Sequence, residues 1–252
     1  MSMEKDLINQ PIALVTATRK EMQAVLGGRT KRLALMVNHP EKLMWGPRPV
    51  ILLITGIGPV NAALALGLLL GKKPGLAGVL NVGMAGSFQP EKIPLGKVVS
   101  VQTEIWPEFG LYTEEGLDPQ GLGLGQGRVQ DHVVWDRLDL HPPEQAYQMG
   151  LELSTSWPQV KSLSVAGVSG SSARAAELQA KTRAEVENME GFALAWACAL
   201  QEVPFVQIRA ISNRVGSRDK KEWNMGLALN SLRQATKRLL GPDQDPLSGQ
   251  KQ

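Results

Sequence analysis

Short apolar segments alternate with helix-like segments along most of this chain, and this alternation strongly limits the folds that it can adopt. Residues 11–17, 50–55 and 78–82 are mostly apolar, and runs of this length indicate strands that are buried on both faces. Between them, residues 18–26 and 60–70 have the composition of helices. The pattern predicts an α/β fold: a three-layer sandwich in which helices cover both faces of a mixed, mainly parallel central sheet.

The alternation continues toward the end of the chain, so we expect residues 11–240 to form a single domain. The segments 1–10 and 241–252 are polar, and we expect these termini to be frayed. Further strands are expected at 97–103, 162–169 and 205–211, and further helices at 171–180, 191–200 and 223–239.

Residues 106–157 interrupt the alternation. They are rich in glycine, proline and acidic residues, and the stretch 121–125 reads Gly-Leu-Gly-Leu-Gly. Such a composition favours little regular structure. We expect a long excursion over the mouth of an active site, because a long irregular segment in a compact protein often has that role.

The composition excludes several classes of function. A net charge of +3 over 252 residues is too small to indicate a nucleic-acid partner, and no apolar run approaches the roughly 20 residues that span a membrane. The single cysteine, Cys198, lies in an apolar run and indicates a buried thiol rather than a nucleophile. The three histidines have no ligand-like spacing, so no metal site is expected. We expect a cytoplasmic protein with neither nucleic-acid nor membrane partners.

A glycine-containing turn at Thr55–Asn61 superficially suggests a dinucleotide-binding motif. Asn61 occupies the place of the third glycine, and no acidic residue ends the next strand, where Leu80–Val82 lies. The contact to a cofactor ribose is therefore missing. The turn therefore predicts a structural role and no nicotinamide cofactor.

Two polar groups, Glu190 and Asn213, stand at the ends of otherwise apolar segments. Burying them is unfavourable unless a partner is present, and a ligand rich in hydroxyls and ring nitrogens would supply one. The strings around them, Asn188–Gly191 and Ile208–Asn213, resemble the ribose- and base-binding half of the purine nucleoside phosphorylase and nucleosidase superfamily. The continuation Val215–Asp219 with Trp223 is similar to the futalosine hydrolase branch. The resemblance covers about residues 12–239 and implies a nucleoside phosphorylase-like fold.

The resemblance implies that Glu21 acts as a general base. In related nucleosidases a glutamate at this place activates the attacking water, and ligands gather at the carboxyl ends of parallel strands such as the first one here. The alternative is a solvated first-turn glutamate that the helix dipole favours.

Met189 and Glu190 resemble the Met-Glu pair of the superfamily. There the glutamate accepts hydrogen bonds from the ribose hydroxyls and the methionine packs on the sugar. Charge-assisted hydrogen bonds would hold the sugar while positive charge builds at its anomeric carbon. The alternative is a helix-terminal glutamate without a ligand.

Met84, Ala85 and Gly86 belong to a segment that resembles a second signature, a loop after the central strand in which glycine lets the backbone approach a ligand. In the phosphorylase branch an arginine precedes this signature and holds phosphate, whereas Asn81 stands here. Losing a guanidinium removes the natural bidentate partner of phosphate. Water is therefore the expected nucleophile. Arg19 could still recruit an anion, so a phosphorylase remains an alternative.

Asn213 departs from the aspartic acid that protonates N7 in adenine-cleaving relatives. An amide has no acidic proton, but it can donate a hydrogen bond to N7 and engage the six-position oxygen. A 6-oxopurine leaves more easily as an anion, so the substitution favours hypoxanthine as the leaving base.

Arg218 and Asp219 complete the string that resembles futalosine hydrolases. Asp219 assists proton transfer near the base in one interpretation, and the pair is a plain surface ion pair in the other. Gly170 and Ser171 align with a segment that shapes the purine pocket in relatives, while Ser171 is equally suited to cap a helix. Candidates for the aromatic carboxylate at the 5′ end are an arginine and three aromatic residues, Phe88, Trp106 and Phe109.

The resemblance implies an N-ribosyl hydrolase that cleaves futalosine to hypoxanthine and dehypoxanthine futalosine in menaquinone biosynthesis, without metal or organic cofactor. Relatives also imply a homo-oligomer, dimeric or larger. Two alternatives are catalytic: another purine nucleosidase, of the methylthioadenosine or adenosylhomocysteine type, or a purine nucleoside phosphorylase. The third is a non-catalytic nucleoside-binding protein.

Overall fold

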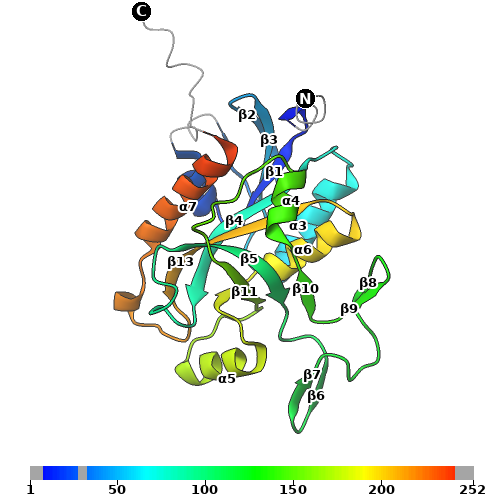
Figure 1. The fold of residues 1–252 in the computed structure, drawn as a ribbon, viewed down its shortest axis with the longest axis vertical. Helices are drawn as coiled ribbons and strands as arrows, with labels where there is room; N and C mark the ends of the chain where they lie inside the picture. The colour runs from blue at the N-terminus through cyan, green and yellow to red at the C-terminus, as the bar shows by residue number, and fades with distance from the viewer. Residues whose placement is uncertain (1–7, 28–32, 242–252) are drawn as a thin grey trace, which may run out of the picture.

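The computed structural model describes residues 8–27 and 33–241 (Figure 1). Most of the polar termini discussed above lies outside these residues. The strands are β1 (Ile12–Thr16), β2 (Glu41–Trp45), β3 (Arg48–Ile54), β4 (Gly78–Ser87), β5 (Val98–Ile105), β6 (Leu111–Thr113), β7 (Gly116–Asp118), β8 (Gly127–Val129), β9 (His132–Val134), β10 (Arg137–Asp139), β11 (Gln159–Ser164), β12 (Val186–Asn188) and β13 (Phe205–Arg214).

The helices begin where the sequence supplies start signals. Thr18 caps α2, and Pro59 occupies the first turn of α3, where its missing N–H has no partner to lose. The α-helices are α2 (Arg19–Leu26), α3 (Pro59–Gly71), α4 (Pro142–Gln148), α5 (Ser172–Thr182), α6 (Gly191–Leu200) and α7 (Met225–Leu240), and a short 3-10 helix spans Lys220–Glu222.

One nine-stranded mixed sheet organises the described part of the chain, in the spatial order β10-β5-β11-β12-β4-β1-β3-β2. β13 pairs in parallel with β4 and antiparallel with β5. The strands β5, β11, β12 and β4 are also paired one after another across the sheet. β13 therefore closes a ring of strands with them. The ring brings the ends of β4, β12 and β13 to one place.

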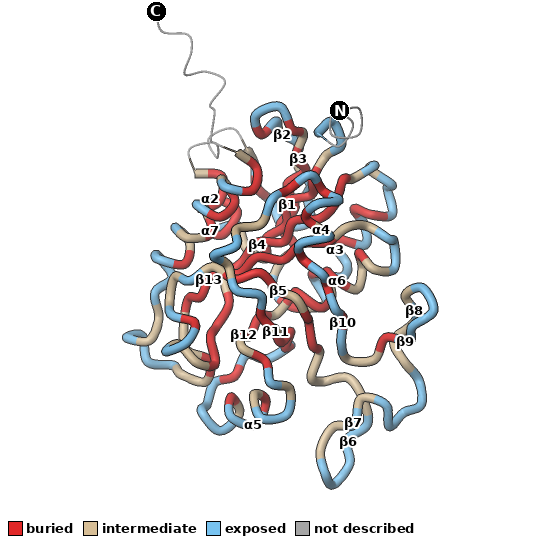
Figure 2. Tube along the Cα trace, in the orientation of Figure 1, coloured by how far each residue is buried: buried red, intermediate tan, exposed pale blue. Residues whose placement is uncertain are grey.

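Helices cover both faces of the sheet, with α2 and α7 on one side and α3 and α6 on the other (Figure 1). Successive strand residues alternate between two core clusters: Ala13 and Val15 pack with α3 and α6, whereas Ile12 and Leu14 pack with α2 and α7. Both faces are therefore buried, as the red tube of the central strands in Figure 2 shows. The predicted α/β sandwich is confirmed.

The prediction of a loop at residues 83–87 was wrong, because these residues continue strand β4. Their partner β13 extends alongside as far as the pair Arg214 and Ser87. The glycines that suggested a loop serve close packing instead: a Cβ atom at Gly83 would collide with the Arg209 guanidinium, and one at Gly86 would lie 3.0 Å from Asn213 Nδ2.

The expected excursion over the active-site mouth was also wrong in its placement. Residues 106–157 form the small hairpins β6–β7 and β8–β9, strand β10 at the sheet edge, and α4. The hairpins project away from the sheet on the α6 side (Figure 1), and Val134 and Leu138 join the core cluster that contains α6. None of these residues lines the cavity described below.

Candidate active site

A cavity of about 330 Å³ lies at the carboxyl ends of the parallel strands β1, β4 and β13, where β12 also ends. Its size suits a small ligand, and this edge of a parallel sheet is where ligands bind in α/β folds. It brings together most of the residues that the sequence singled out: Glu21, Met84, Ala85, Gly86, Met189, Glu190, Asn213 and Arg218.

Glu21 is both a helix cap and a wall of the cavity. Its Oε2 accepts hydrogen bonds from the Thr18 backbone N at 2.9 Å and from the Thr18 hydroxyl at 2.7 Å, which forms a capping box. Its Oε1 accepts one from Met84 N at 2.9 Å. The first-turn role and the cavity position therefore coexist, and the cap fixes the carboxylate, which is only 4% exposed, beside the cavity.

Glu190 follows β12 and is held from the opposite side by the glycine turn before α3. The Gly58 N–H donates a 2.9 Å hydrogen bond to Glu190 Oε1, and Gly58 has φ +92°, a conformation that favours glycine. Burial raises the pKa of Glu190, while the Arg209 guanidinium and the Gly58 N–H act in the opposite direction. The turn that superficially resembled a dinucleotide motif thus serves to position this carboxylate.

Arg209 is a site residue that the sequence analysis missed. It lies on β13 and is 1% exposed. A Cβ atom at Gly83 would meet both Arg209 Nη1 and Glu21 Oε1, so the two groups converge at this glycine. The Nη2 of Arg209 donates to Asn188 Oδ1 at 3.3 Å. The signal was a charged residue inside the apolar segment 205–211. The positive charge of Arg209 lies close enough to Glu190 to favour its ionised form.

A buried polar network lies beneath the Met189–Glu190 turn. Asn188 Oδ1 accepts hydrogen bonds from Glu190 N at 2.9 Å and Gly191 N at 2.7 Å. Its Nδ2 donates to Glu104 Oε1 at 2.8 Å, and Ser164 donates to the other oxygen of Glu104. Burial raises the pKa of Glu104, which the charge of Arg209 opposes. The network fixes the turn that presents Glu190, since its partners leave the Asn188 amide one orientation.

A second site residue that the sequence analysis missed is Glu187, a carboxylate that also lines the cavity. It accepts hydrogen bonds from Ser169 N at 3.0 Å and from the Ser169 hydroxyl at 2.6 Å. Burial raises the pKa of Glu187, although the Ser169 hydrogen bonds lower it. Asn213 lies across from it, with Oδ1 accepting from the Ser212 hydroxyl and Nδ2 donating to Arg214 O.

Arg218 and Trp223 stand at the cavity with apolar neighbours Ile57 and Met225. The Arg218 guanidinium lies 5.5 Å from the centre of the Trp223 ring, within cation–π range. The three aromatic candidates for the 5′ end do not line the cavity. Phe88 belongs to the core cluster beneath α5, and Trp106 packs on Phe109 and Phe192.

Three other residues singled out in the sequence lie outside the cavity. Ser171 caps α5 by accepting from Arg174 N at 3.3 Å, and exposed Gly170 precedes it, while the neighbouring Ser169 lines the cavity instead. Asp219 is exposed and caps the 3-10 helix through Lys221 N at 2.9 Å. Its carboxylate therefore serves a local cap, and it is the Asp219 backbone N that reaches a cavity residue, donating to the Ser217 hydroxyl at 3.2 Å.

Neither of the two positions considered for phosphate binding lines the cavity. Asn81 is buried, donates to Val15 O at 3.1 Å, and does not line the cavity, and Arg19 is exposed outside it. Among the described lining residues, Arg218 is the cationic one. In the described ranges, no group of His, Cys, Asp or Glu side chains is arranged to hold a metal ion. Cys198 is buried within α6, and burial raises its pKa.

The description "Phosphorylase superfamily" belongs to the family model that matches residues 11–241, and the chain belongs to that superfamily. Within it, the chain is similar to two futalosine hydrolases. The protein of Thermus thermophilus is 36% identical over 199 residues, 77% of this chain and 82% of the relative. That of Streptomyces coelicolor is 34% identical over 195 residues, 75% and 77% of the respective chains.

Solved structures show the same fold at lower sequence identity. A futalosine hydrolase mutant of Helicobacter pylori superposes with a TM-score of 0.67 at 18% identity, covering 91% of this chain and 96% of that one. The 5′-methylthioadenosine/S-adenosylhomocysteine nucleosidase of Campylobacter jejuni gives a TM-score of 0.66 at 19% identity, covering 92% and 97%. Among the described residues no helix is long and apolar enough to cross a membrane.

Proposed function

We propose that this protein hydrolyses the N-ribosidic bond of futalosine, releasing hypoxanthine and dehypoxanthine futalosine in a route to menaquinone. The observation that carries the proposal is that Glu21, Glu190 and Asn213 line one cavity, while Arg19 and Asn81 lie outside it. The similarity to two futalosine hydrolases over most of their length supports the choice of substrate.

At the ribose end, Glu21 takes a proton from water while the water oxygen attacks C1′. The C1′–N9 bond breaks and its electron pair leaves with the purine. Glu190 accepts hydrogen bonds from ribose hydroxyls and stabilises the positive charge that develops on the sugar. Arg209 stands behind both carboxylates, and its charge favours the ionised form of Glu190.

At the base end, Asn213 exchanges its local partners for the departing purine. Its carboxamide donates to N7 and contacts the six-position oxygen. Hypoxanthine leaves as a hydrogen-bonded anion, so the site needs no aspartic acid at this position.

Outside the base, Arg218 and Trp223 suit the aromatic carboxylate of futalosine. A guanidinium pairs with a carboxylate, and an indole ring stacks on an aromatic ring. The apolar side chains Ile57 and Met225 also line the cavity.

The test is release of free base from futalosine, inosine and methylthioadenosine in phosphate-free buffer, followed by chromatography. Hypoxanthine from futalosine alone supports the proposal. Release only when phosphate is added contradicts it and indicates a phosphorylase. Binding of futalosine without turnover, unchanged by Glu21→Gln, indicates the non-catalytic alternative.

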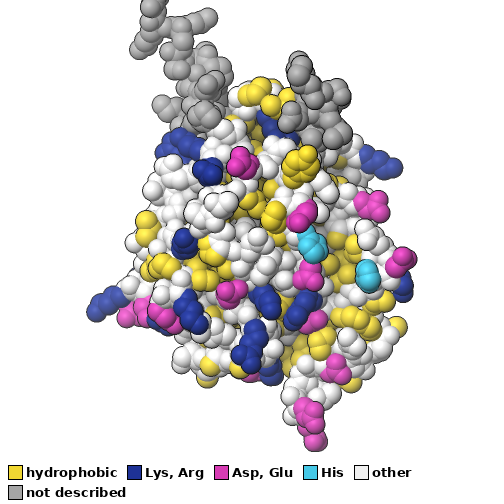
Figure 3. Space-filling view, viewed as in Figure 1, with side chains coloured by type: hydrophobic (Ala, Val, Ile, Leu, Met, Phe, Trp, Pro, Cys, Tyr) yellow, Lys and Arg dark blue, Asp and Glu magenta, His cyan; other side chains and the backbone are white. Residues whose placement is uncertain are grey.

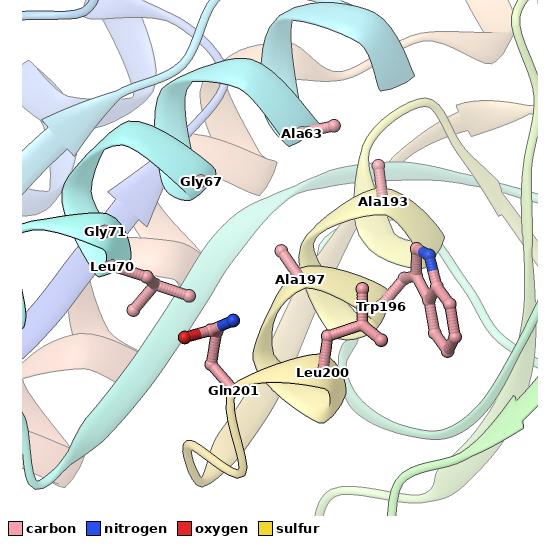
Figure 4. Close-up of a pocket in the computed structure, with 9 residues that line it drawn as sticks. All are labelled: Ala63, Gly67, Leu70, Gly71, Ala193, Trp196, Ala197, Leu200 and Gln201. Carbon is pink, nitrogen blue, oxygen red and sulfur yellow. The ribbon is translucent and has the colours of Figure 1, made fainter. Parts of the chain in front are cut away.

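We also propose a homo-oligomer, with a second copy of this chain seated on α3 and α6. Val60, Leu64 and Leu68 are spaced four residues apart on α3 and are 79%, 54% and 58% exposed. A groove of about 300 Å³ runs between the two helices, with Ala63 facing Ala193 and Gly67 facing Ala197 (Figure 4). The first of these three exposed apolar residues lies three positions after Ile57, which lines the active-site cavity. Light scattering should show a dimer or larger species that Leu64→Glu dissociates; a monomeric wild type contradicts it.

The partners proposed here are thus a small nucleoside and further copies of the chain, in the cytoplasm. Acidic and basic side chains are interspersed on the face shown in Figure 3 rather than gathered in one basic patch. A nucleic-acid partner would require such a patch.

A further inference from the structure

Glu187 is a buried carboxylate that the mechanism above does not use. It is 6% exposed and lines the cavity beside Val168 and Ser169. Its hydrogen bonds come from one residue: Ser169 N donates to Oε1 at 3.0 Å, and the Ser169 hydroxyl donates to Oε2 at 2.6 Å. Each carboxylate oxygen has acceptor capacity for a further donor.

The sheet register places Glu187 opposite Asn213 across a gap. Glu187 pairs with Gly86 on one side of β4, and Asn213 pairs with Gly86 on the other. Paired residues project from the same face of a sheet, and neighbouring strands lie about 4.8 Å apart. The two side chains therefore start about 10 Å apart, and Gly86 places no side chain between them. A flat heterocycle fits between such walls.

We propose that Glu187 accepts a hydrogen bond from N1–H of a 6-oxopurine and determines the specificity of this site for that class of base. The inference rests on the proposed nucleoside hydrolase and names what selects its leaving group. On a 6-oxopurine, N7 and O6 face the Asn213 amide and N1–H faces the Glu187 carboxylate, so the base spans the gap between the two walls.

A 6-aminopurine presents the opposite pattern. Its N1 carries a lone pair instead of a hydrogen, so it faces the carboxylate with an acceptor. A buried acceptor left without a donor is strongly unfavourable, and sites built on such hydrogen bonds reject the mismatched ligand far better than apolar pockets do. Asn213 alone cannot supply this discrimination, because its amide both donates and accepts.

The surroundings of Glu187 support its role as an acceptor. Ser169 N–H can only donate, so Oε1 carries no proton toward it. Arg174 favours the ionised form and Glu108 opposes it, and these two residues face each other at 4.0 Å. Glu187 itself takes no part in that ion pair, which leaves its free lone pairs for a ligand.

The test compares futalosine with its 6-amino analogue in the wild type and in Glu187→Gln. A carboxamide keeps both Ser169 contacts, with its oxygen accepting from Ser169 N and its nitrogen donating to the hydroxyl, so the fold should survive. The wild type should prefer the 6-oxo substrate by on the order of 10²-fold in kcat/KM, and the variant should narrow that ratio at least about tenfold. Glu177→Gln, on the exposed face of α5, is the matched control and should leave the ratio unchanged.

An unchanged ratio in folded Glu187→Gln overturns the inference while leaving the hydrolase intact. If the wild type fails to hydrolyse futalosine, the proposed function fails, and calorimetry with free bases decides the inference separately. Hypoxanthine should then bind the wild type at least about tenfold more tightly than 1-methylhypoxanthine, which lacks the N1 hydrogen, and Glu187→Gln should lessen this difference. Equal affinities in the wild type overturn the inference even where Glu187→Gln does not fold.

Discussion

The two ends of the cavity are built in different ways. At the ribose end, carboxylates are held by hydrogen bonds between distant parts of the chain: Glu190 is bound by Gly58, 132 residues away, and Glu21 by Met84, 63 residues away. At the base end, the side chain of Asn213 forms its hydrogen bonds with its chain neighbours Ser212 and Arg214.

Under the proposed function, this difference separates the groups that hold the substrate from those that distinguish one substrate from another. Groups fixed by several elements of the fold are preorganised, so they can stabilise developing charge without moving. A locally bonded amide can exchange its partners for a ligand at little expense to the fold. We therefore expect substitutions at the ribose end to lower turnover of every substrate, and substitutions at the base end to change the choice among substrates.

The largest expected effect comes from Glu190→Ala. Removing the carboxylate eliminates the charge-assisted hydrogen bonds to the ribose, so kcat/KM should fall by about 10³-fold. The variant removes the hydrogen bond that Gly58 N–H donates to Glu190, which is unfavourable, but it also removes a buried charge, which is favourable. The fold should therefore survive. Steady-state kinetics and circular dichroism check both statements. Near-normal activity would remove Glu190 from the site.

Glu21→Gln should lower kcat by about 10²-fold, because an amide cannot take the proton of water. Glu21 also caps α2, and this variant disturbs the cap, so a control is needed. Thr18→Ala removes the capping hydroxyl but keeps the carboxylate. It should lower the free energy of unfolding by about 1 kcal/mol with a much smaller loss of kcat. Equal losses of kcat in both variants would mean that Glu21 acts only through the helix.

The pH dependence of KM sharpens the comparison further. Glu190 must be ionised to accept the ribose hydroxyls, and burial raises its pKa above the ordinary value of 4.5. As the pH falls through this raised pKa, the carboxylate is protonated and KM should rise, before an ordinary glutamate would titrate. Glu190→Gln should abolish this rise. A wild-type KM that is constant down to pH 4.5 contradicts the role of burial.

The smallest effect is expected for Asp219→Asn. Asp219 is exposed and caps the 3-10 helix outside the cavity, and exposed side chains of this kind contribute little. Both kcat and KM should remain within about twofold of the wild type. A loss of kcat of about 10²-fold, typical of a removed proton donor, would restore the proton-transfer role considered from the sequence.

Local apolar patterns predicted the layers of the fold, and the resemblance to the superfamily predicted eight of the residues that line the cavity. Continuous apolar runs identified β1, β3 and β13, and the apolar segment 191–200 is the predicted helix α6. Prediction from the sequence failed where the role of a residue depends on a distant partner. Gly83 and Gly86 suggested a loop, yet they make room for Arg209 and Asn213 on the adjacent strand.

The missed site residues share the same cause. Arg209 and Glu187 are charged residues inside strands β13 and β12, and their chemistry appears only when the register places them beside Glu21 and Gly86. β12 is three residues long, too short for a periodic pattern to emerge. A charged residue within an apolar strand was the available signal, and it marks Arg209 in the segment 205–211.

The most direct test of the contrast between the two ends is the ratio of kcat/KM for futalosine and its 6-amino analogue in Asn213→Asp and Glu190→Ala. An aspartic acid can protonate N7, so Asn213→Asp should shift the ratio toward the 6-amino substrate by at least about tenfold. Glu190→Ala should lower both values equally and leave the ratio unchanged. A ratio that moves in Glu190→Ala but not in Asn213→Asp would contradict the account.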